Sequence, residues 1–166
     1  MRWRPLILRA CVFLGLLCSG LAATSASAAE AKVKKVLMHL LDQQGRHTIN
    51  ASLYDRDAYQ KYLRKHPEEQ GGLRFDVQWT SDRAHRDGLV LRVEIRSLRT
   101  RSTDSPNDMF RSKTLETPVH RHGLFGTWDS VTMSSKEYKE FGEITAWRAS
   151  LWDGSRLVSE QKSFLW

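Results

Sequence analysis

The clearest structural signal in the chain is the segment at residues 73–79, which reads Leu-Arg-Phe-Asp-Val-Gln-Trp. Its apolar side chains recur at every second position, which is the period of a β-strand with one buried face. Residues 89–95 repeat this alternation, and the polar stretch at residues 81–88 suits a hairpin connection. The two segments therefore predict an antiparallel pair of strands whose apolar faces line the core.

Five further strands are expected around this pair. They are predicted within residues 33–41, 113–119, 130–133, 144–152 and 157–165. Asp153-Gly154 predicts a tight hairpin turn between the last two, because glycine readily adopts the positive φ that such a turn requires. About seven short strands in a chain of this length are typical of an antiparallel β-sandwich.

One helix is expected as an insertion after the first strand. Ser52 or Asp55 can cap its N-terminus, and acidic residues lie at its start. The run from Ala58 to Arg64 has basic residues in its last turns and ends before Pro67. Tyr54, Ala58 and Tyr62 share one face of this helix at i, i+4 spacing. We therefore expect the helix to lie across an open end of the sheets with this face inward.

The C-terminal half of the pattern resembles an immunoglobulin-like or fibronectin type III-like domain. The resemblance is carried by a strand ending at Met133, a short turn at residues 134–142 with a capping-box signature, and the strands at 144–152 and 157–165. In such domains a tyrosine before the penultimate strand bonds to the backbone at a corner, and Tyr138 matches that position. The resemblance implies a mostly β fold, an antiparallel immunoglobulin-like β-sandwich of about seven strands with one inserted helix after the first strand.

The chain from residue 29 onward is also similar to small exported bacterial proteins. The shared segments are Gly45–Thr48, Ser52–Tyr54, Phe75–Trp79 and Lys162–Trp166. This resemblance implies no particular activity. The chain departs from antibody domains in two respects, since it lacks their cysteine pair and carries a helical insertion after the first strand.

Residues 1–28 have the features of a signal peptide. Three arginines precede an apolar stretch at residues 12–21. This stretch is too short to span a bilayer, which requires about 20 residues. Ala26-Ser27-Ala28 matches a signal-peptidase site, so we expect cleavage after Ala28, with cleavage after Ala29 as the near alternative. We therefore predict export by the general secretory route to the periplasm or the medium, and one β-sandwich domain at residues 29–166.

The composition changes when this leader is removed. The full chain has 166 residues, 26 Lys+Arg, 19 Asp+Glu and a formal charge of +7, and this charge falls to +4 because three arginines leave with the leader. Both cysteines leave as well, which excludes disulfides, thiolate nucleophiles and cysteine-ligated metals in the mature protein. Basic and acidic residues are interleaved along the remaining strands, so no nucleic-acid partner is expected. No stable membrane insertion is expected after cleavage.

His120 and His122 are the candidate metal ligands. Side chains at i and i+2 of an extended strand project to the same side, so the two imidazoles can share one ion. No third ligand is identifiable, and the alternative interpretation is a solvated strand end. The remaining histidines are scattered without metal-binding spacing, at His39, His47, His66 and His85.

Trp152 and Arg148 are the candidate binding residues. If Trp147, Ala149 and Leu151 point into the core, Trp152 lies on the outer face of its strand together with Arg148. An exposed tryptophan beside an arginine can stack on a sugar ring or anchor a protein interface. In the alternative, Trp152 covers the end of the sandwich beneath the inserted helix.

Catalysis is not expected. The chain has no nucleophile elbow, no Ser-x-x-Lys motif, and no phosphate-binding or dinucleotide-binding loop, so we predict no catalytic residues and no cofactor. We predict a non-catalytic exported binding or structural module of the cell envelope, with a protein or an envelope glycan as its partner. The alternatives are a carbohydrate-binding module that uses the Trp/Arg face, and a His-ligated metal protein or small hydrolase. The sequence leaves the ligand and the oligomeric state open.

Overall fold

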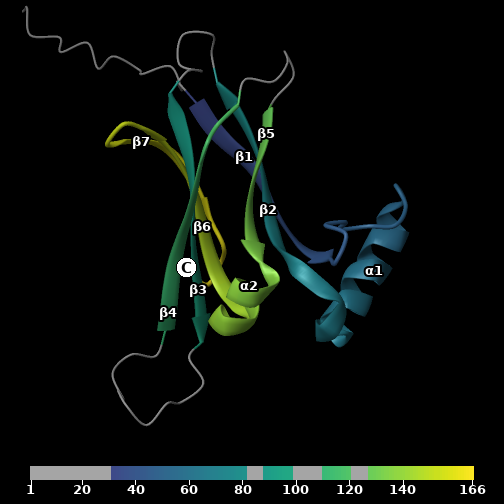
Figure 1. Cartoon of the computed structure of the whole chain (residues 1–166). Helices are drawn as coiled ribbons and strands as arrows, with labels where there is room; N and C mark the ends of the chain where they lie inside the picture. The colour runs from purple at the N-terminus through teal and green to yellow at the C-terminus, as the bar shows by residue number, and fades with distance from the viewer. Residues whose placement is uncertain (1–30, 82–87, 99–109, 121–126) are drawn as a thin grey trace, which may run out of the picture.

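The computed structural model describes residues 31–81, 88–98, 110–120 and 127–166. Within these residues it contains seven strands, two α-helices and one short 3-10 helix (Figure 1). In chain order they are β1 (Ala31–Asp42), α1 (Leu53–Lys65), the 3-10 helix (Pro67–Glu69), β2 (Gln70–Ser81), β3 (Leu89–Leu98), β4 (Phe110–Pro118), β5 (Thr127–Ser134), α2 (Ser135–Phe141), β6 (Ile144–Asp153) and β7 (Arg156–Lys162).

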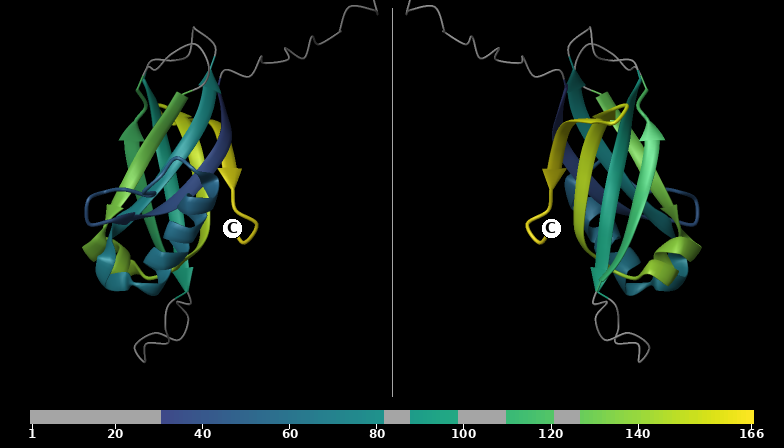
Figure 2. Two further views of the ribbon diagram at one scale, coloured as in Figure 1. Left: turned by 90° about the vertical axis from the view of Figure 1, so that its right-hand side faces the viewer. Right: turned by 90° about the vertical axis from the view of Figure 1, so that its left-hand side faces the viewer.

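The strands form two antiparallel sheets that pack face to face, as the two views of Figure 2 show. One sheet has the order β1-β2-β5 and the other has the order β4-β3-β6-β7. At one seam β1 lies beside β7, where the Val33 amide donates to Ser159 Oγ at 3.1 Å. The predicted immunoglobulin-like β-sandwich, with a helix inserted after the first strand, is therefore confirmed. Here β4 pairs with β3, whereas a constant-type immunoglobulin domain places its fourth strand beside the fifth.

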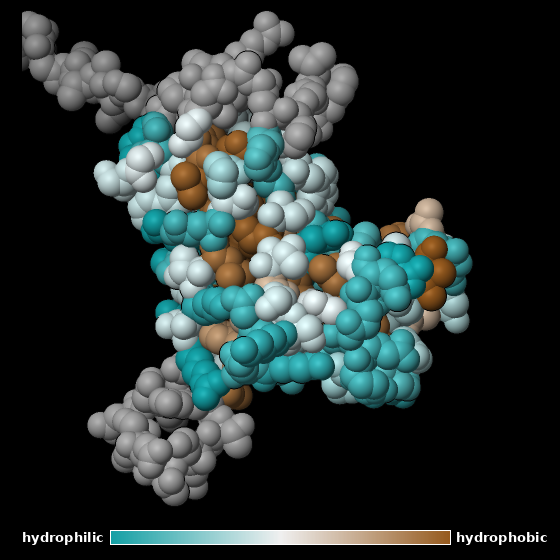
Figure 3. All heavy atoms as spheres, in the orientation of Figure 1, coloured by the Kyte–Doolittle hydropathy of each residue, from teal (hydrophilic) through white to brown (hydrophobic). Residues whose placement is uncertain are grey.

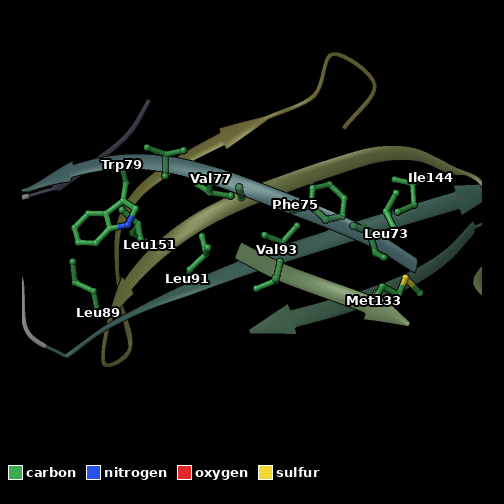
Figure 4. Close-up of a cluster of buried hydrophobic side chains, with 14 of the residues drawn as sticks. Leu73, Phe75, Val77, Trp79, Leu89, Leu91, Val93, Met133, Ile144 and Leu151 are labelled. Carbon is green, nitrogen blue, oxygen red and sulfur yellow. The ribbon is translucent and has the colours of Figure 1, made fainter. Parts of the chain in front are cut away.

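The core forms between the inner faces of β2 and β3, as predicted from their alternation. The expected hairpin pairing of these two strands is wrong, because β2 pairs with β1 and β5 whereas β3 pairs with β4 and β6 in the other sheet. Leu73, Phe75, Val77 and Trp79 of β2 are all buried, and so are Leu89, Leu91, Val93 and Ile95 of β3. Figure 4 shows these two rows pointing toward each other across the sandwich. The indole N–H of Trp79 donates to the buried Asp129 Oδ2 at 2.7 Å, so the largest core side chain leaves no polar atom unpaired.

A bulge in β6 changes which of its side chains face the core. Ile144 pairs with Ser97 and Ala146 pairs with Arg96, so Thr145 has no partner residue in β3. Because of this extra residue, Ile144 joins the core although it is an odd number of positions from Ala149, which is also buried. The expectation that residues 147, 149 and 151 face inward agrees with the register of this strand.

Ser52 caps the N-terminus of α1, where its hydroxyl accepts a hydrogen bond from the amide of Asp55. The expected orientation of this helix is wrong. Tyr54 is 81% exposed, and Ala58 and Tyr62 are exposed as well. The helix instead turns Leu63 and Gln60 inward. Figure 3 shows hydrophobic atoms on the outer side of this helix, where Ile49 and Leu53 are also exposed.

A polar contact explains this orientation. The Gln60 carboxamide accepts from the Leu40 amide at 2.8 Å and donates to the Leu40 carbonyl oxygen at 2.9 Å. It therefore pairs with the free edge of β1 as a neighbouring strand would. Gln60 also donates to the carbonyl oxygen of His47 at 2.8 Å, which ties the loop before α1 to the helix. An unpaired backbone group in a buried position costs free energy, so this pairing outweighs the apolar spacing of the opposite face.

No helix in the described part of the chain combines the length and the apolar composition needed to cross a membrane.

The contact between Gln60 and β1 predicts that a substitution at Gln60 lowers the stability of the fold. The substitution Gln60→Leu leaves the Leu40 amide and two carbonyl oxygens without their partner, and we expect it to lower the free energy of unfolding by about 1–3 kcal/mol. Denaturant unfolding measures this change. The control is Lys61→Leu, an exposed neighbour for which we expect a change within about 0.5 kcal/mol. Equal losses in the two variants would contradict a specific role for Gln60.

Candidate functional site

A groove lies between the C-terminal half of α1 and the short helix α2, which sit at the same end of the molecule (Figure 1). It consists of two adjoining hollows of about 150 and 310 Å³ whose linings share Leu40, Arg64, Tyr138 and Glu143. We call the surface defined by these four residues the α1–α2 groove. The larger hollow is within the lower range of cavities that hold small ligands.

The floor of the groove is the end of the hydrophobic core. Leu40 of β1, Leu73 of β2 and Ile144 of β6 are buried and line the smaller hollow. Met38, which is 39% exposed, extends this apolar surface toward solvent. The β6 bulge contributes directly to this floor, because it turns Ile144 to the inner side of the sheet. The groove can therefore accept an apolar group.

Hydrogen bonds hold both walls of the groove in place. On the α1 side, Gln70 Nε2 donates to the Leu63 carbonyl oxygen at 2.7 Å, in addition to the pairing between Gln60 and Leu40. On the α2 side, Ser135 Oγ donates to the Gln70 carbonyl oxygen at 2.7 Å. Gln70 therefore connects the two walls, and the groove does not depend on ligand binding for its shape.

The capping box predicted for α2 is present. The Ser134 side chain accepts from the Glu137 amide, and the Glu137 carboxylate accepts from the Ser134 amide at 3.0 Å. The hydrogen bond from Lys113, followed by those from Ser134, lowers the pKa of Glu137 to about 2. This cap orients the short helix that carries Tyr138.

Tyr138 lies in the groove and packs against the core from α2. Burial, and after it the negative charge of Glu143, raise the pKa of its phenol, so the hydroxyl stays protonated at neutral pH. Within the described residues the structure gives this hydroxyl no hydrogen-bond partner. Tyr138 is therefore at the corner before β6 that the resemblance implies, but it is held there by packing instead of by a backbone hydrogen bond.

The rim of the groove carries charges without internal partners. Arg64 projects from the last turn of α1, and Glu143 lies between α2 and β6. Both are exposed, and within the described residues neither forms an ion pair or a hydrogen bond through its side chain. Lys139 adds a second cation to the lining of the larger hollow. The side chains of Arg64, Tyr138 and Glu143 are thus all available to a ligand.

Trp152 and Arg148 lie on the outer face of the four-stranded sheet, which is the first of the two placements considered from the sequence. The Arg92 guanidinium stacks over the Trp152 ring, 4.5 Å from its centroid, and the indole N–H of Trp152 donates to Ser150 Oγ at 2.8 Å. Arg148 belongs to a different stack, because it pairs with Glu94 and lies 5.1 Å from the ring of Trp166. The two candidate residues are therefore not partners, and one face of Trp152 is already occupied by an arginine.

The proposed metal pair is only partly within the described residues. His120 is described, and its amide and its Nδ1 both lie near Asp129 Oδ1, at 3.0 and 3.3 Å. His122 lies outside the described residues. In the part of the chain that the structure describes, no group of three or more His, Cys, Asp and Glu side chains is arranged to hold a metal ion.

A polar cluster that the sequence analysis missed lies on the outer face of the three-stranded sheet. His39 Nδ1 is 3.0 Å from Asp76 Oδ2, and Ser130 Oγ donates to Asp76 Oδ1 at 2.6 Å. Arg74 contacts both Asp76 and His47 Nδ1, the latter at 3.0 Å, and the rings of His39 and His47 stack at 4.7 Å. No spacing in the sequence could reveal this cluster, because His47 reaches it only when the loop before α1 folds back over β1.

The environment of the cluster shifts two pKa values. Burial by itself would raise the pKa of Asp76, but hydrogen bonds from His39 and Ser130 and the charge of Arg74 lower it to about 2. Burial lowers the pKa of His47, and the neighbouring His39 and Arg74 lower it further. A neutral His47 can accept the hydrogen bond from Arg74, whereas a protonated one cannot. The cluster thus holds the loop to the sheet most firmly when His47 is neutral.

Comparison with known protein families, with curated proteins and with solved structures finds no match for this chain.

The polar cluster predicts how stability depends on pH. Because the pKa of His47 is lower in the folded chain than its ordinary value near 6.5, the unfolded chain binds the proton more readily, and the free energy of unfolding falls as the pH drops below about 6.5. Replacing the ring with His47→Phe keeps a stacked partner for His39 but removes this titration. We expect the variant to lose less stability than the wild type between pH 7.5 and 5.5, as measured by denaturant unfolding at each pH.

A second, more acidic step belongs to Asp76 and remains in that variant. Its pKa of about 2 means that it stabilises the fold above its ordinary value near 4 and that this contribution is lost as the pH falls toward 2. An unchanged slope between pH 7.5 and 5.5 in His47→Phe would show that His47 does not titrate as the geometry requires.

Proposed function

We propose that this protein is a non-catalytic binding module of the cell envelope that holds a small amphipathic ligand in the α1–α2 groove. The observation that carries the proposal is the combination of an apolar floor with three polar groups, Arg64, Tyr138 and Glu143, that lack internal partners among the described residues. Elsewhere in the described core, buried polar side chains such as Gln60 and Asp129 are hydrogen-bonded. A ligand in the groove would pair with these three groups, which no described side chain satisfies.

Two of the three polar groups of the groove, Arg64 and Tyr138, suit binding better than proton transfer. An arginine stays charged in proteins, and the raised pKa of Tyr138 keeps its phenol as a hydrogen-bond donor. Neither group can act as a general base at neutral pH. Their chemistry supports a role in orienting a ligand.

The carbohydrate alternative places the ligand on the outer face of the four-stranded sheet instead. A sugar ring stacks on an open aromatic face. The Arg92 guanidinium already covers one face of the Trp152 ring. The metal alternative requires His122, which lies outside the described residues. Because Arg92 already covers one face of Trp152, we assign the ligand to the groove.

Export is the second part of the proposal and has a direct test. When the full chain is expressed in a Gram-negative host, we expect the protein in the periplasmic or secreted fraction, with Ala29 as its first residue, or Glu30 if cleavage follows Ala29. N-terminal sequencing of the fractionated protein determines this. Recovery of an intact N-terminus beginning at Met1 would contradict export.

Ligand binding is tested by thermal unfolding in the presence of four ligand classes: amino acids, short peptides, oligosaccharides and fatty acids. We expect one class to raise the Tm of the wild type, since a ligand at 100 times its Kd stabilises a protein by about 2.7 kcal/mol. Met38→Trp places a larger ring at the partly exposed edge of the groove, and we expect it to abolish the shift. Lys61→Trp, an exposed site on α1 outside the groove, is the matched control and should retain it.

A wild type that no class stabilises would contradict the proposed function. A ligand class that stabilises Met38→Trp as much as the wild type would also contradict it, because that ligand would then bind elsewhere on the molecule.

A further inference from the structure

We infer that the ligand of the α1–α2 groove is a short zwitterionic peptide with an apolar side chain. This inference rests on the proposed function, since it names the ligand class for the same site. It is carried by the signs and positions of the unpaired charges at the rim, together with the apolar floor between them.

The charges at the rim have opposite signs and come from different elements. Arg64 belongs to α1, whereas Glu143 follows α2 and precedes β6. Both line both hollows, yet they do not form an ion pair with each other, so their charged atoms are more than 4.0 Å apart. A ligand that joins them must therefore bridge a gap and carry charges of both signs at separate points.

A ligand with a single charge would bring that charge close to a rim group of the same sign. A fatty acid would place its carboxylate near Glu143, and an amine would place its cation near Arg64 and Lys139. A zwitterion satisfies both signs, because its carboxylate can pair with Arg64 and its ammonium group with Glu143. Guanidinium and carboxylate groups form paired hydrogen bonds in a plane, which also orients the ligand.

The groups between the two charges suit a peptide. The Tyr138 phenol is a donor without a partner in the described residues, and it lines both hollows together with Arg64 and Glu143. It can donate to a peptide carbonyl oxygen between the two termini. Below it, Leu40 and Ile144 form an apolar surface that can cover a side chain of the ligand. A bare amino acid has no central carbonyl group to use this donor.

The other open surfaces of the described chain carry less information about a ligand. The outer face of α1 exposes Leu53 and Tyr54, at 67% and 81%, but nothing in the structure shows what covers it. The cluster around Asp76 is bonded within itself, so it leaves no comparable set of open groups. Among the described residues, the groove combines a hollow, a floor formed by the buried core residues Leu40, Leu73 and Ile144, and unpaired charges of both signs.

The inference is tested with Leu-Leu and two blocked forms of it. N-acetyl-Leu-Leu lacks the ammonium charge, and Leu-Leu amide lacks the carboxylate. With the wild-type protein, measured by isothermal titration calorimetry, we expect each blocked form to bind about 3–5-fold more weakly than Leu-Leu, which is the size of effect that exposed ion pairs produce. The charges are exposed, so a larger factor is not expected.

Two variants assign each end of the peptide to its partner. Arg64→Met should remove the preference for Leu-Leu over its amide while leaving the preference over the acetyl form, and Glu143→Gln should do the reverse. Lys65→Met and Glu68→Gln are the matched controls, because they remove exposed charges of the same signs that do not line the groove. All four positions are exposed, and an unchanged Tm of each variant without ligand checks that it is folded.

The outcomes separate this inference from the proposed function. If the blocked peptides bind the wild type as well as Leu-Leu does, or if the control variants change the preferences equally, the inference is overturned although the groove still binds. If Leu-Leu does not bind, but another ligand class raises the Tm of the wild type and not that of Met38→Trp, the inference is likewise overturned. The proposed function then stands. If no class binds, both are overturned.

Discussion

The packing of the inner face of β2 against that of β3 is the constraint on which the rest of the structure depends. Each is an interior strand of its own sheet, and their alternating apolar residues are buried together in one cluster. A shift of one residue in either strand would turn its apolar row to solvent, so this contact sets the register of every neighbouring strand. The Trp79 indole adds a directional element, because its hydrogen bond to Asp129 fixes how β2 meets β5.

Polar contacts decide how the inserted helix is attached to this sandwich. β1 is an edge strand, and its outward backbone groups at Leu40 need partners. The Gln60 carboxamide provides them, and the aromatic face of α1 consequently points to solvent. The same attachment places Arg64 above the end of the core, opposite α2. One edge-strand requirement therefore produces both the exposed helix face and the groove.

The contrast between paired and unpaired polar groups separates structural sites from the candidate binding site. Around Asp76, each charged or polar group meets a partner, and the low pKa of this carboxyl reflects that pairing. On the other sheet, Arg92 stacks on Trp152 and Arg96 stacks on Trp166, so these groups are similarly occupied. At the groove, Arg64 and Glu143 remain unpaired within the described residues. Unsatisfied groups around a preformed hollow are what a ligand can complete.

The sequence by itself determined the sandwich, the apolar faces of its two central strands, the Asp153-Gly154 hairpin and the caps of both helices, because these features depend on local periodicity and on residues a few positions apart. It did not determine that the two central strands belong to different sheets. Only the tertiary structure decided which face of α1 turns inward, which arginine stacks on Trp152, and that His39 meets His47. The groove belongs to this second group, since its residues come from β1, α1, α2 and the start of β6. No local pattern reports contacts between segments so far apart in the chain; they exist only once the core has brought those segments together.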